Sequence, residues 1–280
     1  MVEILNSSNN ITSLEAPNMS KCYRTIKLRN EQSITWIILN RPQKLNTINL
    51  VMLEELSEAI DNLEEDKKVR CVIITGKGEK AFSAGADITE LQKLTPETAA
   101  QFSMKGQQTF TKLEVMSKPV VAAINGYALG GGLELTLACD FRIAVDSAEL
   151  GCPEIKLGLI PAWGGTQRLP QIVGVADAKW LIMFGDSVKA KEALEMGLTD
   201  KVVLQKELKN ETRTLAQRLC ECSPAALKYT KCAVNSGIQN SFDSGLKKER
   251  DFFAMLFAKK ETKELIEAFV SANQKKEGDY

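Results

Sequence analysis

Short apolar runs that alternate with helical segments constrain the fold of this chain more than any other feature. The runs at 71–74 (CVII), 119–124 (PVVAAI) and 141–145 (FRIAV) have the length and composition of buried strands. Around them, apolar residues recur at helical spacing in 49–63, and a further helix is expected over 97–116. Strands that alternate with helices predict an α/β architecture with wholly or partly parallel strand pairing.

Local signals complete this pattern. Residues 23–28 and 33–39 look like two strands joined by a polar turn at 29–32. Residues 77–87 are expected to form a loop, and the three glycines at 130–132 are expected to open a helix.

The chain divides into three parts by composition. We expect a flexible Asn/Ser-rich tail at 1–20, an α/β core at 21–205 and a helical region at 206–280. The helical region lacks a strand pattern and holds three predicted helices, at 207–222, 225–236 and 242–272. The apolar side chains at 252–257 either pack on the region's own core or form a subunit interface, and the pattern favours neither.

Composition narrows the classes of partner and compartment. Lys plus Arg and Asp plus Glu are both 36 in 280 residues, so no net charge attracts the chain to nucleic acid or to an anionic membrane. No apolar run reaches the roughly 18 residues of a membrane-spanning helix, and the tail lacks the features of a targeting signal. The seven scattered cysteines are typical of reduced, mostly buried thiols. We therefore expect a cytoplasmic protein that binds neither nucleic acid nor membrane.

The chain contains no histidine. This excludes nucleophile–histidine pairs and every histidine-based metal site. Acid–base chemistry must then fall to carboxylates, Lys, Tyr or Cys.

Two loops rich in small residues each precede a helix. The glycines at 130–132 match neither the phosphate loop GxxxxGK[ST] nor the dinucleotide pattern GxGxxG. They serve either tight helix packing or, together with 83–87, two backbone N–H groups that converge on one oxygen as an oxyanion hole. Asp87 has the position of a helix N-cap, and with Glu90 it has the spacing of a capping box.

Two glutamates lie in apolar surroundings. Glu134 stands in GGLELTLA at the first turn of a predicted helix, and Glu154 stands in GCPEIKLGLIP. Each could have a structural partner, because an unpaired buried carboxylate is costly. Together they favour carboxylate chemistry, in which neighbouring pKa values are shifted apart so that one group is an acid and the other a base.

These residues, in this order, resemble the enoyl-CoA hydratase/isomerase (crotonase) family. The resemblance is colinear from about residue 23 to the C-terminus and implies a spiral of ββα units, a C-terminal helical region used in trimerisation, and a homotrimer or homohexamer. Its motifs are ILNRPQKLNTIN (38–49), VIITGKGEKAFSAGADITEL (72–91), KPVVAAINGYALGGGLELTLACDFRIA (118–144) and AELGCPEIKLGLIPAWGGTQRLPQIVG (148–174).

The resemblance also implies roles for individual residues. The backbone N–H groups of Ala84 and Gly131 would hold the thioester oxygen of a trans-2-enoyl-CoA, with Glu134 as base and Glu154 as acid for reversible addition of water. No metal or redox cofactor is needed, and coenzyme A is part of the substrate. The implied substrate-binding residues are Lys44, Leu45, Ala84, Gly85, Ala86, Asp87, Gly131, Ala162 and Trp163.

One stretch departs from the family pattern. Where many hydratases have Pro-Gly, this chain has Pro161-Ala162-Trp163, in which Ala162 keeps a backbone N–H for the water. We hypothesise that Trp163 shortens the acyl pocket; the alternative, that it packs away from the acyl chain, stays open. Both glutamates favour hydration over enoyl-CoA isomerisation or another acyl-CoA reaction, and a non-enzymatic RNA-binding role is disfavoured by the zero net charge.

Overall fold

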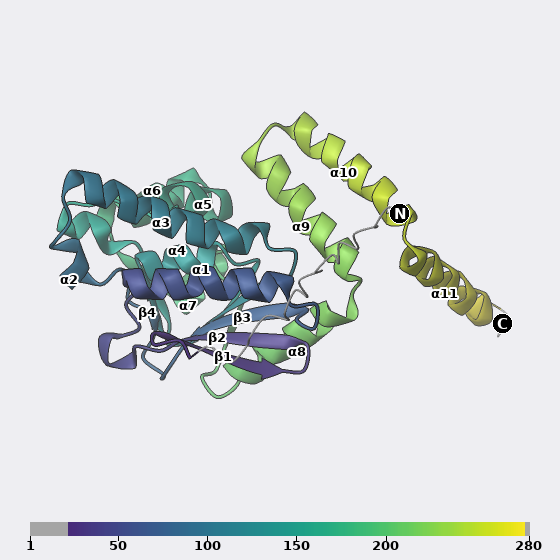
Figure 1. Ribbon diagram of the computed structural model, residues 1–280, viewed down its shortest axis with the longest axis horizontal. Helices are drawn as coiled ribbons and strands as arrows, with labels where there is room; N and C mark the ends of the chain where they lie inside the picture. Colours follow the sequence, from purple (N-terminus) through teal and green to yellow (C-terminus); the bar gives the residue numbers. More distant parts are fainter. Residues whose placement is uncertain (1–21, 278–280) are drawn as a thin grey trace, which may run out of the picture.

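A large sheet forms the centre of the protein. The computed structural model describes residues 22–277, with side chains described to residue 271. The predicted tail at 1–20 lies outside the described residues. The sheet has the order β1-β2-β3-β5-β7-β10, with β1 antiparallel to β2 and every later pair parallel; Figure 1 shows β1, β2 and β3 side by side. This confirms the predicted α/β class with partly parallel pairing. The strands are β1 (Ile26–Glu31), β2 (Ile34–Leu39), β3 (Cys71–Gly76), β5 (Val120–Ile124), β7 (Phe141–Val145) and β10 (Lys201–Val203).

A smaller sheet of three-residue strands lies beside the first. Its order is β4 (Ala81–Ser83), β6 (Tyr127–Leu129), β8 (Glu149–Gly151) and β9 (Ser187–Lys189), with only the β8–β9 pair antiparallel. The chain therefore repeats one unit, because a strand of the large sheet, a strand of the small sheet and a helical segment follow one another from β3, from β5 and from β7. This repeat is the predicted spiral of ββα units.

Helices cover the sheets and extend the C-terminal end of the chain. In Figure 1, α1 and α3 lie side by side, and α3 begins with Thr95 as N-cap in a capping box with Thr98. The helices are α1 (Leu50–Glu65), α2 (Ile88–Leu91), α3 (Pro96–Val115), α4 (Gly131–Leu137), α5 (Gly165–Val173), α6 (Val175–Phe184), α7 (Ala190–Glu195), α8 (Leu208–Glu221), α9 (Pro224–Gln239), α10 (Phe242–Phe257) and α11 (Lys260–Glu277), with 3₁₀ turns η1 (Pro42–Lys44) and η2 (Pro153–Leu157).

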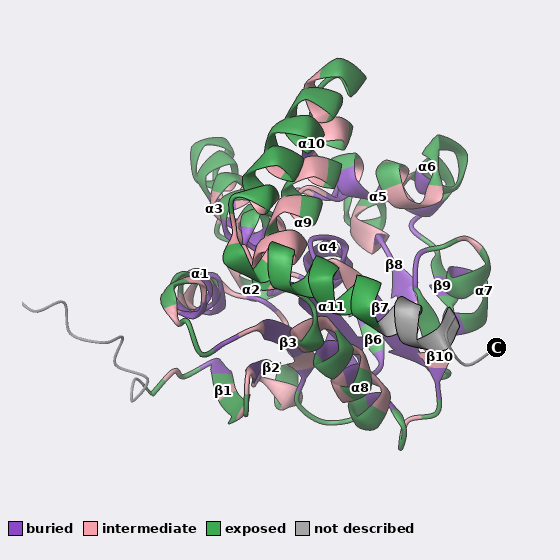
Figure 2. Ribbon diagram, turned by 90° about the vertical axis from the view of Figure 1, so that its right-hand side faces the viewer, coloured by how far each residue is buried: buried purple, intermediate pink, exposed green. Residues whose placement is uncertain are grey.

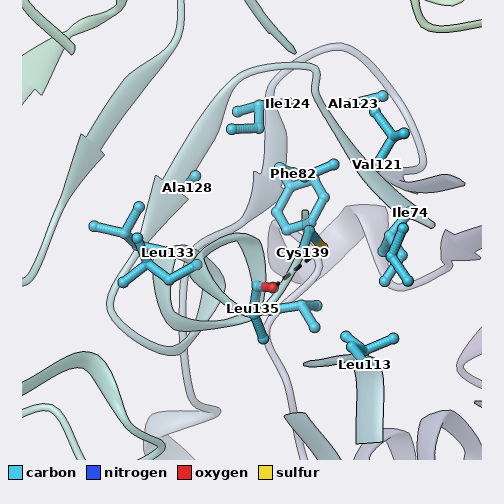
Figure 3. Packing of buried hydrophobic residues seen from close by; sticks show 14 of the residues in the cluster. Ile74, Phe82, Leu113, Val121, Ala123, Ile124, Ala128, Leu133, Leu135 and Cys139 are labelled. Carbon is cyan, nitrogen blue, oxygen red and sulfur yellow. Dashed lines mark hydrogen bonds between the residues drawn. The ribbon is translucent and has the colours of Figure 1, made fainter. Parts of the chain in front are cut away.

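The core lies where the ββα units meet. Figure 3 shows Phe82 of β4 among apolar side chains of both sheets, α3 and α4, including Ile74, Leu113 and Leu135. Phe82 is fully buried, so its truncation to Ala would cost about 3–5 kcal/mol. This packing fixes the loops after β4 and β6 relative to each other, and those loops carry the candidate site.

The C-terminal helices leave apolar side chains exposed. Helix α8 packs on the large sheet, whereas α10 contains no buried residue and extends away from the core (Figures 1 and 2). Phe252 stacks on Tyr229 of α9 with ring centroids 4.8 Å apart, but Phe253 is 64% exposed. The alternative that all of 252–257 packs on the region's own core is therefore wrong for this chain alone. The domain boundary near 205 stays a prediction.

Several predicted details differ from the structure. The predicted turn at 29–32 is mostly strand, since β1 runs to Glu31, and β4 lies inside the predicted loop 77–87. The predicted third C-terminal helix is two helices, which are separated at 258–259. Strand β4 was missed because it has only three residues, too few for a strand pattern to be recognised in the sequence.

The cysteine prediction is wrong in one respect. All seven thiols are free, but only three of them are buried, while three are exposed and one is half-buried. The exposed thiols are those of Cys22, Cys222 and Cys232.

Candidate active site

A cavity of about 710 Å³ lies between the loops after β4, β6 and β8 and the first half of α3. It brings together eight of the predicted site residues, which reach it from different ββα units. These are Ala84, Gly85, Ala86, Gly131, Glu134, Glu154, Ala162 and Trp163.

The glycines at 130–132 combine both roles that the sequence left open. A Cβ on Gly132 would lie 2.2 Å from the Ser83 carbonyl oxygen, so the start of α4 packs against the end of β4 only with glycine there. Gly130 has φ +51° and donates its N–H to the Gly151 carbonyl oxygen at 2.9 Å. Gly131 is the first residue of α4, and its N–H has no acceptor among the described residues. Such an N–H at a helix start is available to an anionic oxygen.

The second predicted donor needs a correction. The Ala84 N–H donates to the Leu45 carbonyl oxygen at 3.0 Å, so it is already used within the protein. The Ala86 N–H, two residues later, has no acceptor in the described part of the chain, and Ala86 lines the cavity. An ideal Cβ on Gly85, the residue between them, would lie 3.5 Å from the Gly131 nitrogen, so the two loops are adjacent. Ala86, rather than Ala84, is the candidate partner of Gly131.

Glu134 is almost fully enclosed, with 2% of its surface exposed. Its Oε1 accepts two backbone hydrogen bonds, from Trp163 N and from Gly165 N, both at 2.7 Å. Burial raises the pKa of Glu134 to about 7; the nearby Glu154 carboxylate adds to the rise, while the two N–H groups oppose it. Near neutral pH this carboxyl can therefore both take and release a proton.

Glu154 faces the same cavity from η2 with fewer partners. Its Oε2 is buried and has no hydrogen-bond partner among the described residues, and burial raises the pKa of the carboxyl. A Cβ on Gly130 would lie 2.7 Å from Glu154 Oε1, so glycine is needed there for the carboxylate to fit. Because like charges in a dry site disfavour double ionisation, the pair favours a state in which one of the two carboxyls carries a proton.

The loop at 161–165 is held on its outer side by contacts that the sequence did not predict. The Ala162 carbonyl oxygen accepts from Ser103 Oγ at 2.7 Å, and the Trp163 carbonyl oxygen accepts from Arg168 Nη1 at 2.7 Å. Arg168 also forms a two-pronged ion pair with Glu114, with N–O distances of 2.6 and 3.1 Å. With its carbonyls held outward, the loop directs its N–H groups at Glu134.

Three predicted substrate-binding residues lie beside the cavity instead of lining it. Asp87 is the N-cap of α2, as predicted, and accepts from Arg41 Nη2 at 2.7 Å. Although burial opposes the shift, the hydrogen bonds from Arg41 and Thr89 lower the pKa of Asp87 to about 2. Lys44 lies 3.6 Å from the Asp87 carboxylate with 53% of its side chain exposed, and Leu45 is part-exposed.

The capping box predicted for α2 is only half formed. Glu90 does not bond back to Asp87; its carboxylate accepts from Leu50 N at 2.8 Å. The glutamate thereby ties α2 to the start of α1.

Sequence reasoning missed Ala86 as a donor, Arg168 and Arg41. An arginine three residues after Gly165, in a helix that is otherwise partly apolar, was the available signal for Arg168. Between residues 22 and 277 no cluster of three or more metal-ligating side chains is found, and no described helix is both long and apolar enough to span a bilayer.

Comparison with known proteins decides the family. The protein-family model described as enoyl-CoA hydratase/isomerase matches residues 29–277 of this chain. The chain belongs to this family.

Individual members of the enoyl-CoA hydratase/isomerase family are similar over most of their length. A crotonyl-CoA hydratase from Syntrophomonas wolfei is 42% identical over 248 residues, which are 89% of this chain and 95% of the relative. A short-chain-enoyl-CoA hydratase from Clostridium acetobutylicum is 41% identical over 87% of this chain and 93% of the relative. The crystal structure of an enoyl-CoA hydratase from Bacillus anthracis superposes with a TM-score of 0.85 at 39% identity, covering 89% of this chain and 97% of that one. The crotonase-like fold is confirmed, and these relatives support the activity of a hydro-lyase.

Proposed function

We propose that this protein is an enoyl-CoA hydratase that adds water reversibly to a short-chain trans-2-enoyl-CoA and gives a 3-hydroxyacyl-CoA. In the reverse direction it is a 3-hydroxyacyl-CoA dehydratase. The observation that carries the proposal is the arrangement of Glu134 and Glu154 on one cavity, beside the N–H groups of Gly131 and Ala86, which have no acceptor among residues 22–277. The names of the similar hydratases support crotonyl-CoA as a substrate.

The two N–H groups act on the thioester. They donate to its carbonyl oxygen and stabilise the negative charge that develops there as C3 becomes electrophilic. Each donor of this kind contributes about 10²–10³ in rate. Because Gly131 begins a helix, the positive end of the helix dipole adds to the effect.

The carboxylates then move two protons. Ionised Glu134, held by the N–H groups of Trp163 and Gly165, takes a proton from the water that attacks C3. Protonated Glu154 gives a proton to C2. The net change is one water added across the double bond, and a proton transferred back from Glu134 to Glu154 restores the starting state. This chemistry uses only an acid, a base and amide donors, so we propose no metal or redox cofactor.

Coenzyme A extends from the thioester past the 84–86 loop. Asp87 supports this loop through its N-cap bond and its ion pair with Arg41, and Leu45 supports it by accepting from Ala84 N. Lys44 carries an exposed ammonium group beside this loop, suited to a phosphate of the nucleotide.

The C-terminal helices assemble the protein into a homotrimer or homohexamer. Support comes from apolar side chains on α10 and α11 that this chain leaves exposed, Phe253, Phe257 and Phe269 among them. Exposed apolar patches that are large and contiguous commonly mark protein–protein interfaces. Light scattering at micromolar concentration should give at least three times the chain mass, and a monomer would contradict this part of the proposal. A cytoplasmic location stays a prediction.

Enoyl-CoA isomerisation is the alternative activity. It needs one group to move a proton between carbons, whereas hydration needs an acid and a base, and both carboxyls are present here. A 3-enoyl-CoA supplied as substrate tests for isomerisation directly.

The decisive experiment replaces each carboxylate by its amide. Glu134→Gln keeps an oxygen that can accept both N–H bonds, and Glu154→Gln keeps the shape of the side chain. We expect each variant to fold and to have a kcat for crotonyl-CoA about 10²–10⁴-fold below that of wild type. The assay follows the decrease of the enoyl-thioester absorbance. If both variants keep full activity, the assigned roles are wrong; if the wild type hydrates no enoyl-CoA, the proposed function is wrong.

A further inference from the structure

The indole of Trp163 fills the space between α3 and α4 at the wall of the cavity. It lines the cavity although only 1% of the residue's surface is exposed. The sequence left open whether this side chain faces the acyl chain or packs away from it. The contacts of the ring decide its position.

Two glycines make room for the ring. A Cβ on Gly106 of α3 would lie 2.1 Å from Trp163 Cδ1, and a Cβ on Gly131 of α4 would lie 2.3 Å from Trp163 Cζ3. The five-membered ring therefore meets α3 and the six-membered ring meets α4. Glycine within a helix is otherwise unfavourable, so the indole accounts for Gly106 in the middle of α3.

The ring is also held from its sides and from its backbone. Phe102 and Phe110 lie with ring centroids 5.2 and 5.6 Å from that of Trp163. The N–H of the same residue donates to Glu134, and its carbonyl oxygen accepts from Arg168. The indole therefore cannot change rotamer, and its loop cannot shift, without loss of these contacts.

We propose that Trp163, seated against Gly106, is a fixed limit on acyl-chain length that restricts this enzyme to short enoyl thioesters of about four carbons. The inference rests on the proposed function. A thioester oxygen at Gly131 and a C3 atom beside Glu134 place the next acyl carbons near the wall that the indole forms, because the indole lies against Gly131 and the backbone N–H of Trp163 holds Glu134. Without the ring, the gap between α3 and α4 would continue the cavity.

The wild-type enzyme gives the first test. We expect kcat/KM for trans-2-octenoyl-CoA to be at least tenfold below that for crotonyl-CoA, since an apolar pocket distinguishes a single methylene by about 10-fold or more. Equal values would overturn the limit while leaving the hydratase proposal intact. Absence of hydration with both substrates would instead overturn the proposed function, and this inference with it.

The second test removes the ring. Trp163→Leu should raise the octenoyl-to-crotonyl ratio of kcat/KM at least tenfold, and an unchanged ratio in this folded variant would overturn the proposal. If the Leu variant does not fold, Trp163→Phe, which keeps a ring against Phe102, should change the ratio in the same direction by a smaller factor, and an unchanged ratio would again overturn it. Phe110→Leu is the matched control: it trims the same aromatic cluster but does not line the cavity, so the ratio should stay at the wild-type value.

Discussion

The two segments that carry the carboxylates, α4 and η2, provide the same chemical group in opposite settings. All seven residues of α4 are buried, and its Glu134 is fixed by two N–H groups. None of the five residues of η2 is buried, and an oxygen of its Glu154 has no described partner. Two N–H groups hold the Glu134 carboxyl in one place, as a base that positions a water requires, whereas Glu154 has fewer groups to fix it. We expect this difference in setting, more than the residue type, to separate the base from the acid.

Substitution of a glycine in α4 and of one just after η2 should give the largest difference in activity between the two segments. Gly131→Ala places a methyl group 2.3 Å from the indole of Trp163 and shifts the donor N–H, so we expect kcat/KM to fall by about 10²–10³. The matched control is Gly158→Ala just after η2, where no atom of the described residues lies within 4 Å of the new Cβ. Its φ of +70° costs only about 1 kcal/mol of stability, and its activity should stay near wild type. Equal losses in steady-state assays of the two variants would contradict the contrast.

The pH dependence of stability should differ between the segments. The pKa of Glu134 is raised from 4.5 to about 7 in the folded protein, so the folded state retains a proton that the unfolded chain releases. Its contribution to stability is complete below pH 4.5 and is lost as pH rises through about 7, up to about 3 kcal/mol in all. Urea unfolding at pH 4.5 and 7.5 should show this loss in wild type but not in Glu134→Gln.

Glu154→Gln is the comparison variant in that experiment. Burial also raises the pKa of Glu154, so its amide variant should remove a loss of the same sign. Because Glu154 is less buried, the effect should be smaller than at Glu134. A larger effect at Glu154 would mean that its pKa is raised more than that of Glu134, which would contradict this expectation.

Replacement of Arg168 should have the smallest effect on activity, and it tests whether this residue positions the loop that holds Glu134. Arg168→Met frees the Trp163 carbonyl and loosens the loop whose N–H groups hold Glu134, so we expect kcat to fall about tenfold with little change in KM. Loss of those N–H bonds and of the nearby positive charge should also move the acid limb of the pH–kcat profile upward from about 7.

Two further variants separate positioning from stability. Arg168→Lys should restore part of the rate. Lys231→Met breaks another partly buried ion pair, with Asp140, outside the cavity, and should lower stability without moving the acid limb. If both Met variants move the limb alike, Arg168 does not act through the loop.

Sequence reasoning reached the parts of this molecule that local pattern encodes. Strand Phe141–Val145 and the helix that begins after Gly130 were predicted because apolar runs and glycines mark them directly. Ala84 and Ala86 could not be told apart as donors, since the choice depends on the Leu45 carbonyl, which is distant in sequence. Arg168 was missed for the same reason: its role consists of contacts with residues some fifty positions away and with a carbonyl in the adjacent loop.

The amides that hold Glu134 have a consequence for how the site responds to its medium. Among the described residues that line the cavity, Lys156 is the one cationic side chain, and it pairs with Asp186 at 3.1 Å. The groups that favour the ionised form of Glu134 are the two peptide N–H groups and the buried Arg168 guanidinium, which dissolved ions do not reach. Exposed charges such as Lys44 are screened over about 8–10 Å at ordinary ionic strength. Added salt should thus weaken the capture of a phosphorylated substrate and leave the turnover of bound substrate unchanged.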